Sequence, residues 1–378
     1  MIRPLSGLRI GLLTASASRL GGGVFEAVVN QAAMVRSLGG EVSVFALEDA
    51  HSEADSHRFA GCALSHSRIA GPAQVGYAPG LAGSLLAARL DCLHLHGIWM
   101  YPSRAATWWA RETGRGYIIS PHGMLDPSTV SRRPWKKVLG KIAYERASWR
   151  TATFFHALTD CEAANIDRQA GKVATVKIPN AAPAAITPPA LLRAPTIAYL
   201  GRIHAIKNLE NLIEGWCRAQ LPAGARLVIA GWGDSDDVTR LETRVYAAGP
   251  TVEFVGPAYG ADKRALLEGA RFMVLASHSE AMPMSVLEGW AAATPSIMTK
   301  SCNLPQGFAA GAAIECGDEP TSLAAALEQA LALDEAGWLA MSRAARELAS
   351  GLFSREVVAA AWAAAYRRAV SASGTLSA

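Results

Sequence analysis

Leu8-Arg9-Ile10-Gly11-Leu12-Leu13-Thr14 is an apolar run of strand length, and the glycine-rich turn Gly21-Gly22-Gly23 follows it. Residues 24–38 then carry apolar side chains at helical spacing, and residues 42–45 form a second apolar run. A strand, a turn and a helix that lead to another strand are the parts of a parallel β-α-β unit. The start of the chain therefore predicts an α/β fold.

The same alternation continues along the chain. Further strands are predicted at 92–96, 117–120, 153–157 and 173–178, separated by helices at 103–113, 135–150 and 160–169. A proline-rich stretch at 179–195 has no period that would bury a face. After it, strands are predicted at 196–200, 226–230, 252–255 and 272–276, with helices at 208–220, 238–248 and 261–270.

This pattern predicts two doubly wound parallel-sheet domains. We place the first at residues 1–182 and the second at 183–355, and expect residues 356–378 to form a helix that crosses back to the first domain. Because ligands in open α/β sheets lie at the carboxyl ends of the strands, we expect the chemistry in a cleft between the two domains.

Composition narrows the class of protein. The 378 residues are 51% hydrophobic and 18% charged, which is typical of a globular chain. No apolar run reaches the roughly 18 residues of a membrane-spanning helix, and the first 20 residues lack a signal-peptide pattern, so we expect a cytoplasmic protein. The six cysteines include no Cys-x-x-Cys pair and are interpreted as reduced thiols.

The net charge of +4 conceals an asymmetry. Residues 1–190 carry a net charge of +7, and residues 191–378 carry −3. The first half is therefore expected to meet something anionic or membrane-like, and the second a ligand held by specific contacts.

The most specific motif is a pair of glutamates, Glu280 and Glu288, that follows the strand predicted at 272–276. Pro283 suits the first turn of a helix, and the backbone N–H groups of its neighbours would then be free. Carboxylates accept hydrogen bonds from diols and helix N–H groups bind phosphate, so the segment fits a nucleotide-linked sugar. The alternative is a helix-capping glutamate beside a surface glutamate.

Two cations, Arg202 and Lys207, follow the strand predicted at 196–200. Both are expected at the same strand edge, where they would neutralise a diphosphate leaving group. Gly231 and Gly233 stand in the turn after the next strand and are counted among the nucleotide-binding residues. Solvated charges before a helix are the alternative interpretation of the two cations.

Taken together, Gly201-Arg202-x4-Lys207 and Glu280-x7-Glu288 resemble the donor site of glycosyltransferase family 4, which are retaining enzymes of the GT-B fold. The similarity runs from Gly21-Gly22-Gly23 through Ser120-Pro121-His122-Gly123-Met124-Leu125-Asp126 to Cys302-Asn303-Leu304-Pro305 and the closing helix after Phe353. The implied fold is GT-B, with two Rossmann-like doubly wound domains that face each other across a cleft.

The resemblance also implies roles for single residues. Arg202 and Lys207 would bind the donor diphosphate, Glu280 would contact the transferred sugar, and Glu288 would hold the ribose. His122 would lie on the sugar or acceptor side, and the loop with Gly22 and Gly23 would approach the donor. The catalytic prediction thus comprises Glu280, His122, Lys207 and Arg202, and the backbone prediction comprises Met282, Pro283, Met284 and Ser285. Ala281-Met282 replaces the Gly-Phe of many members, so the sugar itself is not predicted.

The remaining polar residues and the glycine turn do not by themselves predict a ligand. His94 is interpreted as a hydrogen-bonded structural residue, whereas His96 and His122 are expected nearer to the ligand. Asp234 and Asp236 are interpreted as the cap of a helix from residue 238, and no metal and no permanently bound cofactor are predicted. The glycine turn does not spell Gly-x-Gly-x-x-Gly, which disfavours nicotinamide binding.

Basic residues gather in the segment from Arg132 to Arg150, where cations and apolar side chains recur at helical spacing. Such a helix fits the cytoplasmic face of an inner membrane, and a helix packed on its own domain is the alternative. Nucleic acid is not predicted as a partner.

The sequence therefore predicts a retaining glycosyltransferase, with hexosyl transfer expected. A nucleotide diphosphate sugar would be the donor, and a glycan or lipid-linked intermediate of exopolysaccharide or other cell-surface polysaccharide biosynthesis would be the acceptor. A non-catalytic sugar-nucleotide-binding scaffold and a GT-B nucleotide-sugar epimerase are the alternatives.

Overall fold

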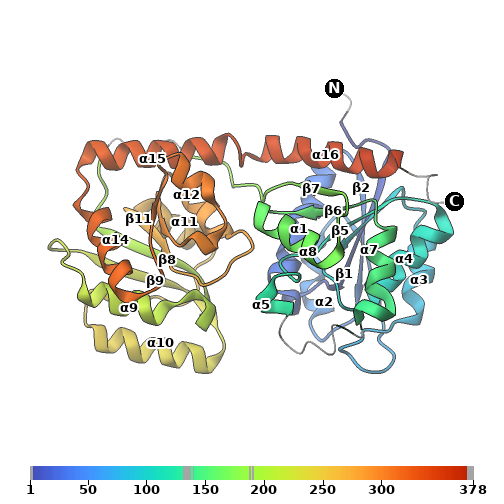
Figure 1. Cartoon of the computed structure of the whole chain (residues 1–378), viewed down its shortest axis with the longest axis horizontal. Helices are drawn as coiled ribbons and strands as arrows, with labels where there is room; N and C mark the ends of the chain where they lie inside the picture. Colours follow the sequence, from blue (N-terminus) through green and yellow to red (C-terminus); the bar gives the residue numbers. More distant parts are fainter. Residues whose placement is uncertain (1–2, 131–137, 139, 187–188, 190, 373–378) are drawn as a thin grey trace. The chain divides into compact units, whose positions relative to one another are not determined.

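A computed structural model describes residues 3–130, 138, 140–186, 189 and 191–372 (Figure 1). The chain divides into two compact units. Unit 1 comprises Met1–Ile178 with Ala359–Ala378, and unit 2 comprises Pro179–Val358. Each unit is built on one parallel sheet, which confirms the predicted α/β class with two doubly wound domains.

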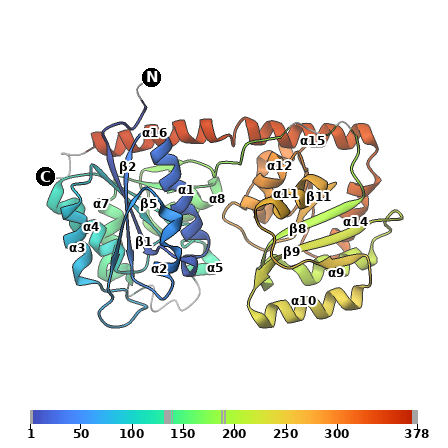
Figure 2. The same ribbon diagram turned by 180° about the vertical axis from the view of Figure 1, so that it is seen from behind.

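Unit 1 has a seven-stranded sheet in the order β3-β2-β1-β4-β5-β6-β7. Helices α1 and α8 cover one face of this sheet, and α3, α4 and α7 cover the other (Figure 2). The elements are β1 (Arg9–Ser16), η1 (Arg19–Gly21), α1 (Gly23–Ser37), β2 (Glu41–Leu47), α2 (Ser52–Asp55), η2 (Ser56–Phe59), β3 (Ala63–Ser67), α3 (Pro79–Ala87), β4 (Cys92–His96), α4 (Tyr101–Thr113), β5 (Tyr117–Ser120), α5 (Pro127–Val130), the π-turn η3 (Lys141–Glu145), α7 (Arg146–Thr151), β6 (Phe154–Ala157), α8 (Asp160–Ala170) and β7 (Thr175–Lys177).

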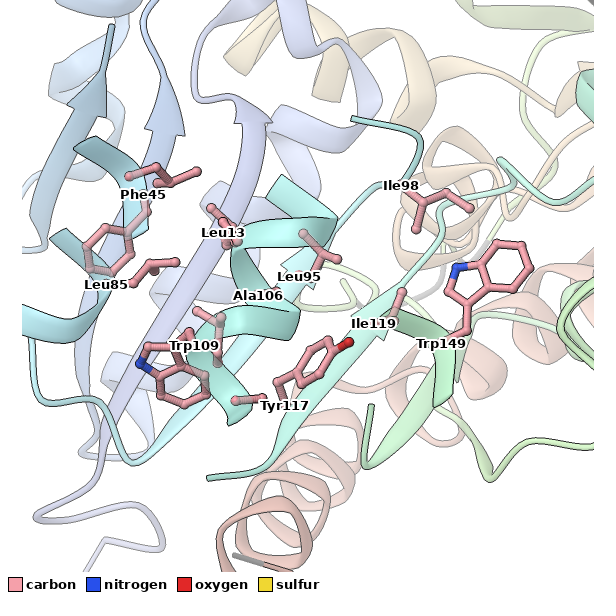
Figure 3. Close-up of a cluster of buried hydrophobic side chains, with 14 of the residues drawn as sticks. Leu13, Phe45, Leu85, Leu95, Ile98, Ala106, Trp109, Tyr117, Ile119 and Trp149 are labelled. Atoms are coloured by element: carbon pink, nitrogen blue, oxygen red, sulfur yellow. The ribbon is translucent and has the colours of Figure 1, made fainter. Parts of the chain in front are cut away.

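The core of unit 1 explains why its strands are continuous apolar runs. Parallel strands covered by helices on both faces bury every side chain, and Leu13, Leu95 and Ile119 from three neighbouring strands are at most 1% exposed. Trp109 of α4 and Tyr117 of β5 fill the space between sheet and helix in the same cluster (Figure 3). Burying such rings is worth on the order of 2–3 kcal/mol each.

Unit 2 has a six-stranded sheet in the order β10-β9-β8-β11-β12-β13. Helix α9 packs against α10 and α14, and α12 packs against α15. The elements are β8 (Thr196–Ile203), η4 (Ala205–Lys207), α9 (Leu209–Arg218), β9 (Arg226–Gly233), α10 (Ser235–Ala248), β10 (Val252–Phe254), α11 (Gly260–Gly269), β11 (Phe272–Leu275), α12 (Met284–Ala291), β12 (Ser296–Met298), η5 (Lys300–Cys302), α13 (Pro305–Ala309), β13 (Ala313–Glu315), α14 (Pro320–Ala332), α15 (Glu335–Ser350) and α16 (Arg355–Ser371).

Helix α16 begins with the last residues of unit 2, and from Ala359 onward its residues belong to unit 1. Within unit 1, Trp362 and Tyr366 of this helix are buried and pack against the ring of His94. The closing helix is therefore part of the core of the first unit.

Part of the predicted basic helix lies outside the described residues. Residues 131–137 and 139 are not among them, so Arg132 and the start of that helix have no structural account. The described remainder forms η3 and α7, and Val138 and Ile142 are exposed. Across the described part of the chain, no helix has both the length and the apolarity needed to cross a bilayer.

Candidate functional site

The strand order of unit 2 reverses between β8 and β11, which lie side by side at the centre of the sheet. Loops that leave neighbouring strands on either side of such a reversal diverge, and ligands of open α/β sheets lie in the opening. A backbone hydrogen bond of 2.9 Å from His278 N–H to the carbonyl of Ile206 joins the two loops. Arg202 lies near the end of β8 itself, Lys207 and Glu280 lie in the segments after β8 and β11, and Glu288 lies in α12, the next helix after β11.

Lys207 and Glu280 form an ion pair at this position. Lys207 ends the short helix η4, and Glu280 lies in the loop after β11. Their side chains are only 18% and 12% exposed, respectively, so the pair is much less screened by water than a surface ion pair. The structure therefore brings together a cation and a carboxylate that are 73 positions apart in the chain.

The loop that carries Glu280 is held from several sides. Ser277 Oγ donates to the Glu280 carboxylate over 2.6 Å, and Glu280 N–H donates to the carbonyl of Ser301 over 3.0 Å. Asn303 Nδ2 donates to the Glu280 carbonyl over 2.6 Å. The carboxylate is thus preorganised, and Ser277 and Asn303 are supporting residues to which sequence reasoning gave no role.

Helix α12 begins at Met284, directly after Pro283 at the N-cap. The prediction placed Pro283 inside the first helical turn, but the helix begins one residue later. Pro283 precedes it, because its ψ of 117° is that of extended backbone. Proline has no side-chain acceptor, and no side chain caps this helix. The N–H groups of Met284 and Ser285 thus begin an uncapped helix, where an anion is stabilised. Met282, just before it, is buried.

Glu288 lies one turn into α12, and Lys263 of α11 donates to its carboxylate over 2.7 Å. The carboxylate side chain is 19% exposed. Sequence reasoning did not find Lys263, because nothing in the pattern of α11 separates it from the other charged residues of that helix.

Arg202 is the more exposed of the two predicted cations. Its guanidinium lies 5.5 Å from the centre of the Trp232 ring and 3.3 Å from a carboxylate oxygen of Asp234. Asp234 is the N-cap residue of α10, but it makes no side-chain cap and pairs with Arg202 instead. The helix begins at Ser235, not at Val238, so the predicted capping role of Asp234 and Asp236 is wrong in its detail.

Close packing of β9 against β8 explains why positions 231 and 233 are glycines. Each faces the neighbouring strand β8, and a Cβ on Gly231 would lie 1.9 Å from the carbonyl oxygen of Gly201. A Cβ on Gly233 would lie 2.4 Å from the carbonyl oxygen of Ile203. Both glycines are therefore needed for β8 and β9 to stay paired up to their carboxyl ends, where the candidate site is.

In unit 1, the predicted glycine loop links η1 to α1. Gly22 has a φ of 53°, a conformation that favours glycine, and a Cβ on Gly22 or Gly23 would meet nothing within 4 Å. The loop is therefore open on that side.

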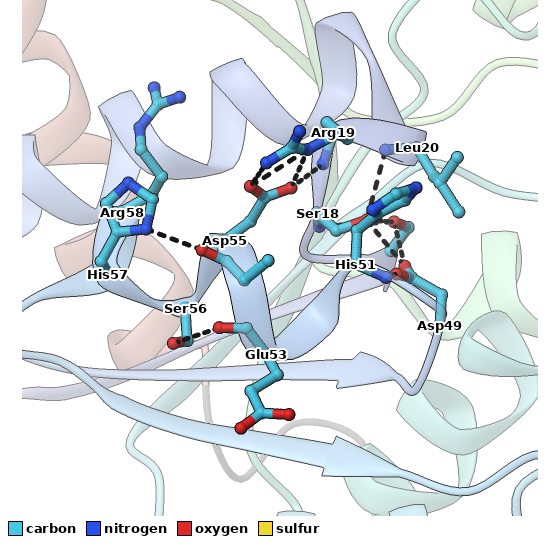
Figure 4. A network of polar contacts seen from close by, with 12 residues as sticks. Ser18, Arg19, Leu20, Asp49, His51, Glu53, Asp55, Ser56, His57 and Arg58 are labelled. Carbon is cyan, nitrogen blue, oxygen red and sulfur yellow. Dashed lines mark hydrogen bonds and ion pairs between the residues drawn. The ribbon is translucent and has the colours of Figure 1, made fainter.

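A polar network holds the residues that lead into this loop (Figure 4). Arg19 donates to the carboxylate of Asp55 with its side chain and its backbone N–H, and these hydrogen bonds hold the pKa of Asp55 well below its usual range. Asp49, after β2, accepts hydrogen bonds from Ser16 and Ser18 over 2.7 and 2.9 Å. The loop is thus anchored by the carboxylates of Asp49 and Asp55.

His122 follows β5 and adopts a φ of 53°. Its ring stacks on that of His96 with the centroids 5.2 Å apart, and His96 Nδ1 and His122 Nε2 share a hydrogen bond of 3.0 Å. Desolvation lowers the pKa of His122 to about 3, which leaves a neutral imidazole. His96 is only 3% exposed and supports the ring of His122, and its expected place near a ligand stays a prediction.

His94 belongs to a buried hydrogen-bond chain. His156 Nε2 faces the carbonyl of Ile178 and must donate to it, so its Nδ1 accepts from Ser120 Oγ. Ser120 in turn accepts from His94 Nε2, and His94 Nδ1 accepts from the hydroxyl of Tyr366. Burial lowers the pKa of His94 and His156, which keeps the rings neutral as this chain requires. The structural interpretation of His94 is confirmed.

Within the described residues, no group of three or more His, Cys, Asp or Glu side chains is arranged to hold a metal ion. The charged side chains paired at the candidate site of unit 2 are the carboxylates of Asp234, Glu280 and Glu288 with the cations of Arg202, Lys207 and Lys263.

Two Rossmann-like units, with paired charges and an uncapped helix at the strand reversal of the second, define a protein of the GT-B class. Comparison with known families agrees with that class. Residues 194–333 match the family "Glycosyl transferases group 1", and residues 22–181 match the family "Glycosyl transferase 4-like domain". The two matches cover most of the chain, which belongs to the group 1 glycosyltransferases.

Curated relatives match the chain over part of their length. It is 32% identical over 174 residues to the lipopolysaccharide core biosynthesis glycosyltransferase LpsE of Rhizobium meliloti, which covers 45% of this chain and 48% of LpsE. It is 29% identical over 172 residues to a glycogen synthase of Mycobacterium tuberculosis, which covers 45% of this chain and 42% of that enzyme. The chain thus matches about half the length of these relatives.

Solved structures show the same fold over nearly the whole chain. The structure of HepE from Anabaena in complex with UDP and glucose has a TM-score of 0.75 at 15% identity, and the match covers 95% of this chain and 99% of that one. A sucrose-phosphate synthase from Thermosynechococcus elongatus has a TM-score of 0.76 at 19% identity, over 97% of this chain and 100% of that one. At these identities the likeness establishes the GT-B fold.

Proposed function

We propose that the protein transfers a sugar from a nucleoside diphosphate sugar to an acceptor hydroxyl, with retention at the anomeric carbon. The observation that carries the proposal is the Lys207–Glu280 pair at the strand reversal of unit 2, close in sequence to the uncapped helix α12. A cation and free helix N–H groups suit a diphosphate, and a held carboxylate suits a sugar hydroxyl. The complexes of HepE with UDP and UDP-glucose support this class of donor.

Each predicted residue has a role in that reaction. The bond between the anomeric carbon and the diphosphate oxygen breaks, and a bond from that carbon to the acceptor oxygen forms. Arg202 and Lys207 would stabilise the negative charge that develops on the leaving diphosphate, which is worth most where water is excluded. By family resemblance the acceptor attacks on the face that the diphosphate leaves, and its proton passes to a leaving phosphate oxygen.

The remaining residues would position the donor. Glu280 would hold a hydroxyl of the transferred sugar, and Glu288 would hold the ribose, for which it must share its carboxylate with Lys263. The backbone from Met282 to Ser285 would lie against the phosphates. Gly22, Gly23 and His122 of unit 1 would serve the donor and the acceptor, with His122 as a neutral hydrogen-bonding group.

For the acceptor, we propose a glycan or lipid-linked intermediate of a surface polysaccharide, such as an exopolysaccharide. The name of the relative LpsE supports a role in surface glycan assembly. A cytoplasmic place, with contact between the basic segment and the inner membrane surface, would bring the acceptor within reach. No permanently bound cofactor and no metal are part of the proposal, since the cations and the helix end supply the positive charge.

A transfer assay with matched variants tests this function. Lys207→Met and Glu280→Gln should each lower kcat/KM for sugar transfer at least about 100-fold, because each removes a group that acts on the reacting centre. Arg226→Met breaks an exposed ion pair with Glu253 at the other end of β9 and should leave transfer unchanged. Near-normal transfer by both site variants would contradict the proposal, and donor binding without turnover by the unmodified protein would favour the scaffold instead.

A further inference from the structure

A cavity of about 350 Å³ in unit 1 has no place in the proposed reaction. It lies between α7 and the end of α8, and its volume is that of a small-molecule pocket. Among the described residues, its lining contains three cationic side chains and no carboxylate. The lining residues are Lys141, Arg146, Trp149, Arg150, Gln169, Ala170 and Gly171.

The two arginines are available to a ligand. Arg146 and Arg150 are one helical turn apart on α7, so both side chains project from the same face of the helix. Both residues are exposed, and neither forms an ion pair or a hydrogen bond with another described side chain. Elsewhere in the described chain arginines commonly pair with carboxylates, as Arg9 and Arg115 do with Asp91.

Lys141 is held at the cavity by the protein itself. Its ammonium group donates to the carbonyl of Gln169 over 2.7 Å and lies 5.3 Å from the centre of the Trp149 ring. Burial and the repulsion of Arg146 lower the pKa of Lys141. Like charges that gather without a counterion among the described residues work against the folded state, and an anion bound in the cavity would relieve their repulsion.

The cavity is distinct from the candidate site. Arg150 and Gly171 each stand four residues before a strand, β6 and β7, respectively. In a parallel sheet these positions lie at the edge where strands begin, whereas His122 and the glycine loop follow strand ends. A ligand in the cavity would therefore not occupy the position of the transferred sugar.

We propose that this cavity binds a phosphate-bearing anion. The planar guanidinium groups of Arg146 and Arg150 present paired N–H donors that match phosphate oxygens, and the ammonium of Lys141 adds a third charge. The same chemistry is offered by a soluble phosphate compound and by the headgroup of an anionic lipid. The three cations belong to the basic segment that is proposed above to contact the membrane, so a lipid headgroup in the cavity would deepen that part of the proposed function. Phosphate binding itself does not depend on sugar transfer.

Calorimetric titration with inorganic phosphate, against chloride at equal ionic strength, tests the site directly. The unmodified protein should bind phosphate, and Arg146→Gln/Arg150→Gln should weaken binding at least about tenfold. Arg104→Gln/Arg111→Gln removes the same charge from exposed positions of α4 outside the cavity and should bind like the unmodified protein. Lys207→Met should also retain binding, which separates this site from the candidate donor site.

A vesicle arm identifies the source of the phosphate. A lipid headgroup is the ligand if three results are found together. Vesicles of phosphatidylglycerol and phosphatidylcholine bind the unmodified protein, they do not bind the Arg146→Gln/Arg150→Gln variant, and free phosphate releases the bound protein from them. If phosphate binding alone is lost in that variant, the ligand is a soluble phosphate compound. Unchanged phosphate binding in the variant, or an equal loss in the α4 control, would overturn the proposal. Partial recovery of phosphate binding in Arg146→Lys/Arg150→Lys would show that substitution at these two positions leaves the protein folded.

Discussion

At the scale of single residues, two glycines that were predicted to bind the nucleotide, one in each unit, differ in what a methyl group would meet. A Cβ on Gly231 would collide with the backbone of β8, whereas a Cβ on Gly23 would enter open space at the first position of α1. Gly231→Ala should therefore lower the free energy of unfolding by about 2–3 kcal/mol. Gly23→Ala should leave it within about 0.5 kcal/mol, since alanine also suits a helix.

Urea unfolding of the two variants measures this difference, and a nucleotide titration adds a second reading. If the glycine loop approaches the donor as proposed, Gly23→Ala should weaken nucleotide-sugar binding without loss of stability. Equal stability of the two variants would show that the pairing of β8 and β9 does not exclude a side chain at Gly231.

Glu145 is a second residue with a testable charge state. Its Oε1 accepts hydrogen bonds from Trp99 N–H over 2.5 Å and Ser103 Oγ over 2.8 Å, whereas its Oε2 is buried without a hydrogen-bond partner among described residues. Burial raises the pKa of Glu145 to about 7, so the folded state binds a proton that the unfolded state releases near pH 4.5. Its contribution to stability is present at low pH and is lost as the pH rises through 7.

Glu145→Gln removes this titration while keeping the shape of the side chain. Between pH 5 and pH 8, the unmodified protein should lose about 2–3 kcal/mol of unfolding free energy relative to the variant. Chemical unfolding at a series of pH values gives this difference. Parallel curves for the two proteins would mean that Glu145 does not change its protonation over this range.

At the scale of elements, the hydroxyl of Tyr366 links the closing helix α16 to the sheet of unit 1. It donates to His94 Nδ1 and accepts from Gln31 of α1, each over 2.8 Å, and all three residues are buried. Tyr366→Phe leaves two buried polar groups without a partner and should destabilise the protein by about 2–3 kcal/mol. Tyr246→Phe is the matched control, because Tyr246 is 91% exposed, and an equal effect of both changes would contradict the linkage.

The same chain of buried histidines predicts sensitivity to acid. Burial lowers the pKa of His156 to about 4, so the unfolded state takes up protons near pH 6.5 while the folded state does not. The stability from neutral histidines is complete above pH 6.5 and is lost as the pH falls toward 4, by about 3 kcal/mol for His156 alone. Glu145 acts in the opposite direction over part of this range, so the Glu145→Gln background gives the cleaner measurement. In the Glu145→Gln background, a flat unfolding free energy from pH 7 to 4.5 would contradict this account.

Some strands were predicted from the sequence at their observed bounds, and others were missed. Strands β4 and β5 were predicted at their observed bounds, because each is an apolar run that ends at a polar residue. Strands β12 and β13 were missed, since three residues are too few to show a period. The side chains of the candidate site were found from strand ends, but their pairing was not predicted. The contacts of Glu280 with Lys207 and of Glu288 with Lys263 depend on which strands and helices become neighbours.

At the scale of the whole molecule, the charge asymmetry of the sequence has two structural counterparts. Most of the acidic second half belongs to unit 2, where the positive groups of Arg202 and Lys207 lie at the strand reversal. The basic first half contributes the cationic cavity of unit 1. If both proposals hold, unit 2 binds a diphosphate at strand ends and unit 1 binds a phosphate group where strands begin.

The central claim is that unit 2 binds the diphosphate of a nucleotide sugar through Lys207. Calorimetric titration with UDP-, GDP- and ADP-sugars tests it most directly, in the unmodified protein, in Lys207→Met and in the control Arg226→Met. We predict that one nucleotide class binds, that Lys207→Met weakens its binding at least about tenfold, and that Arg226→Met does not. Binding of none of the three classes, or equal affinity in Lys207→Met, would contradict the account.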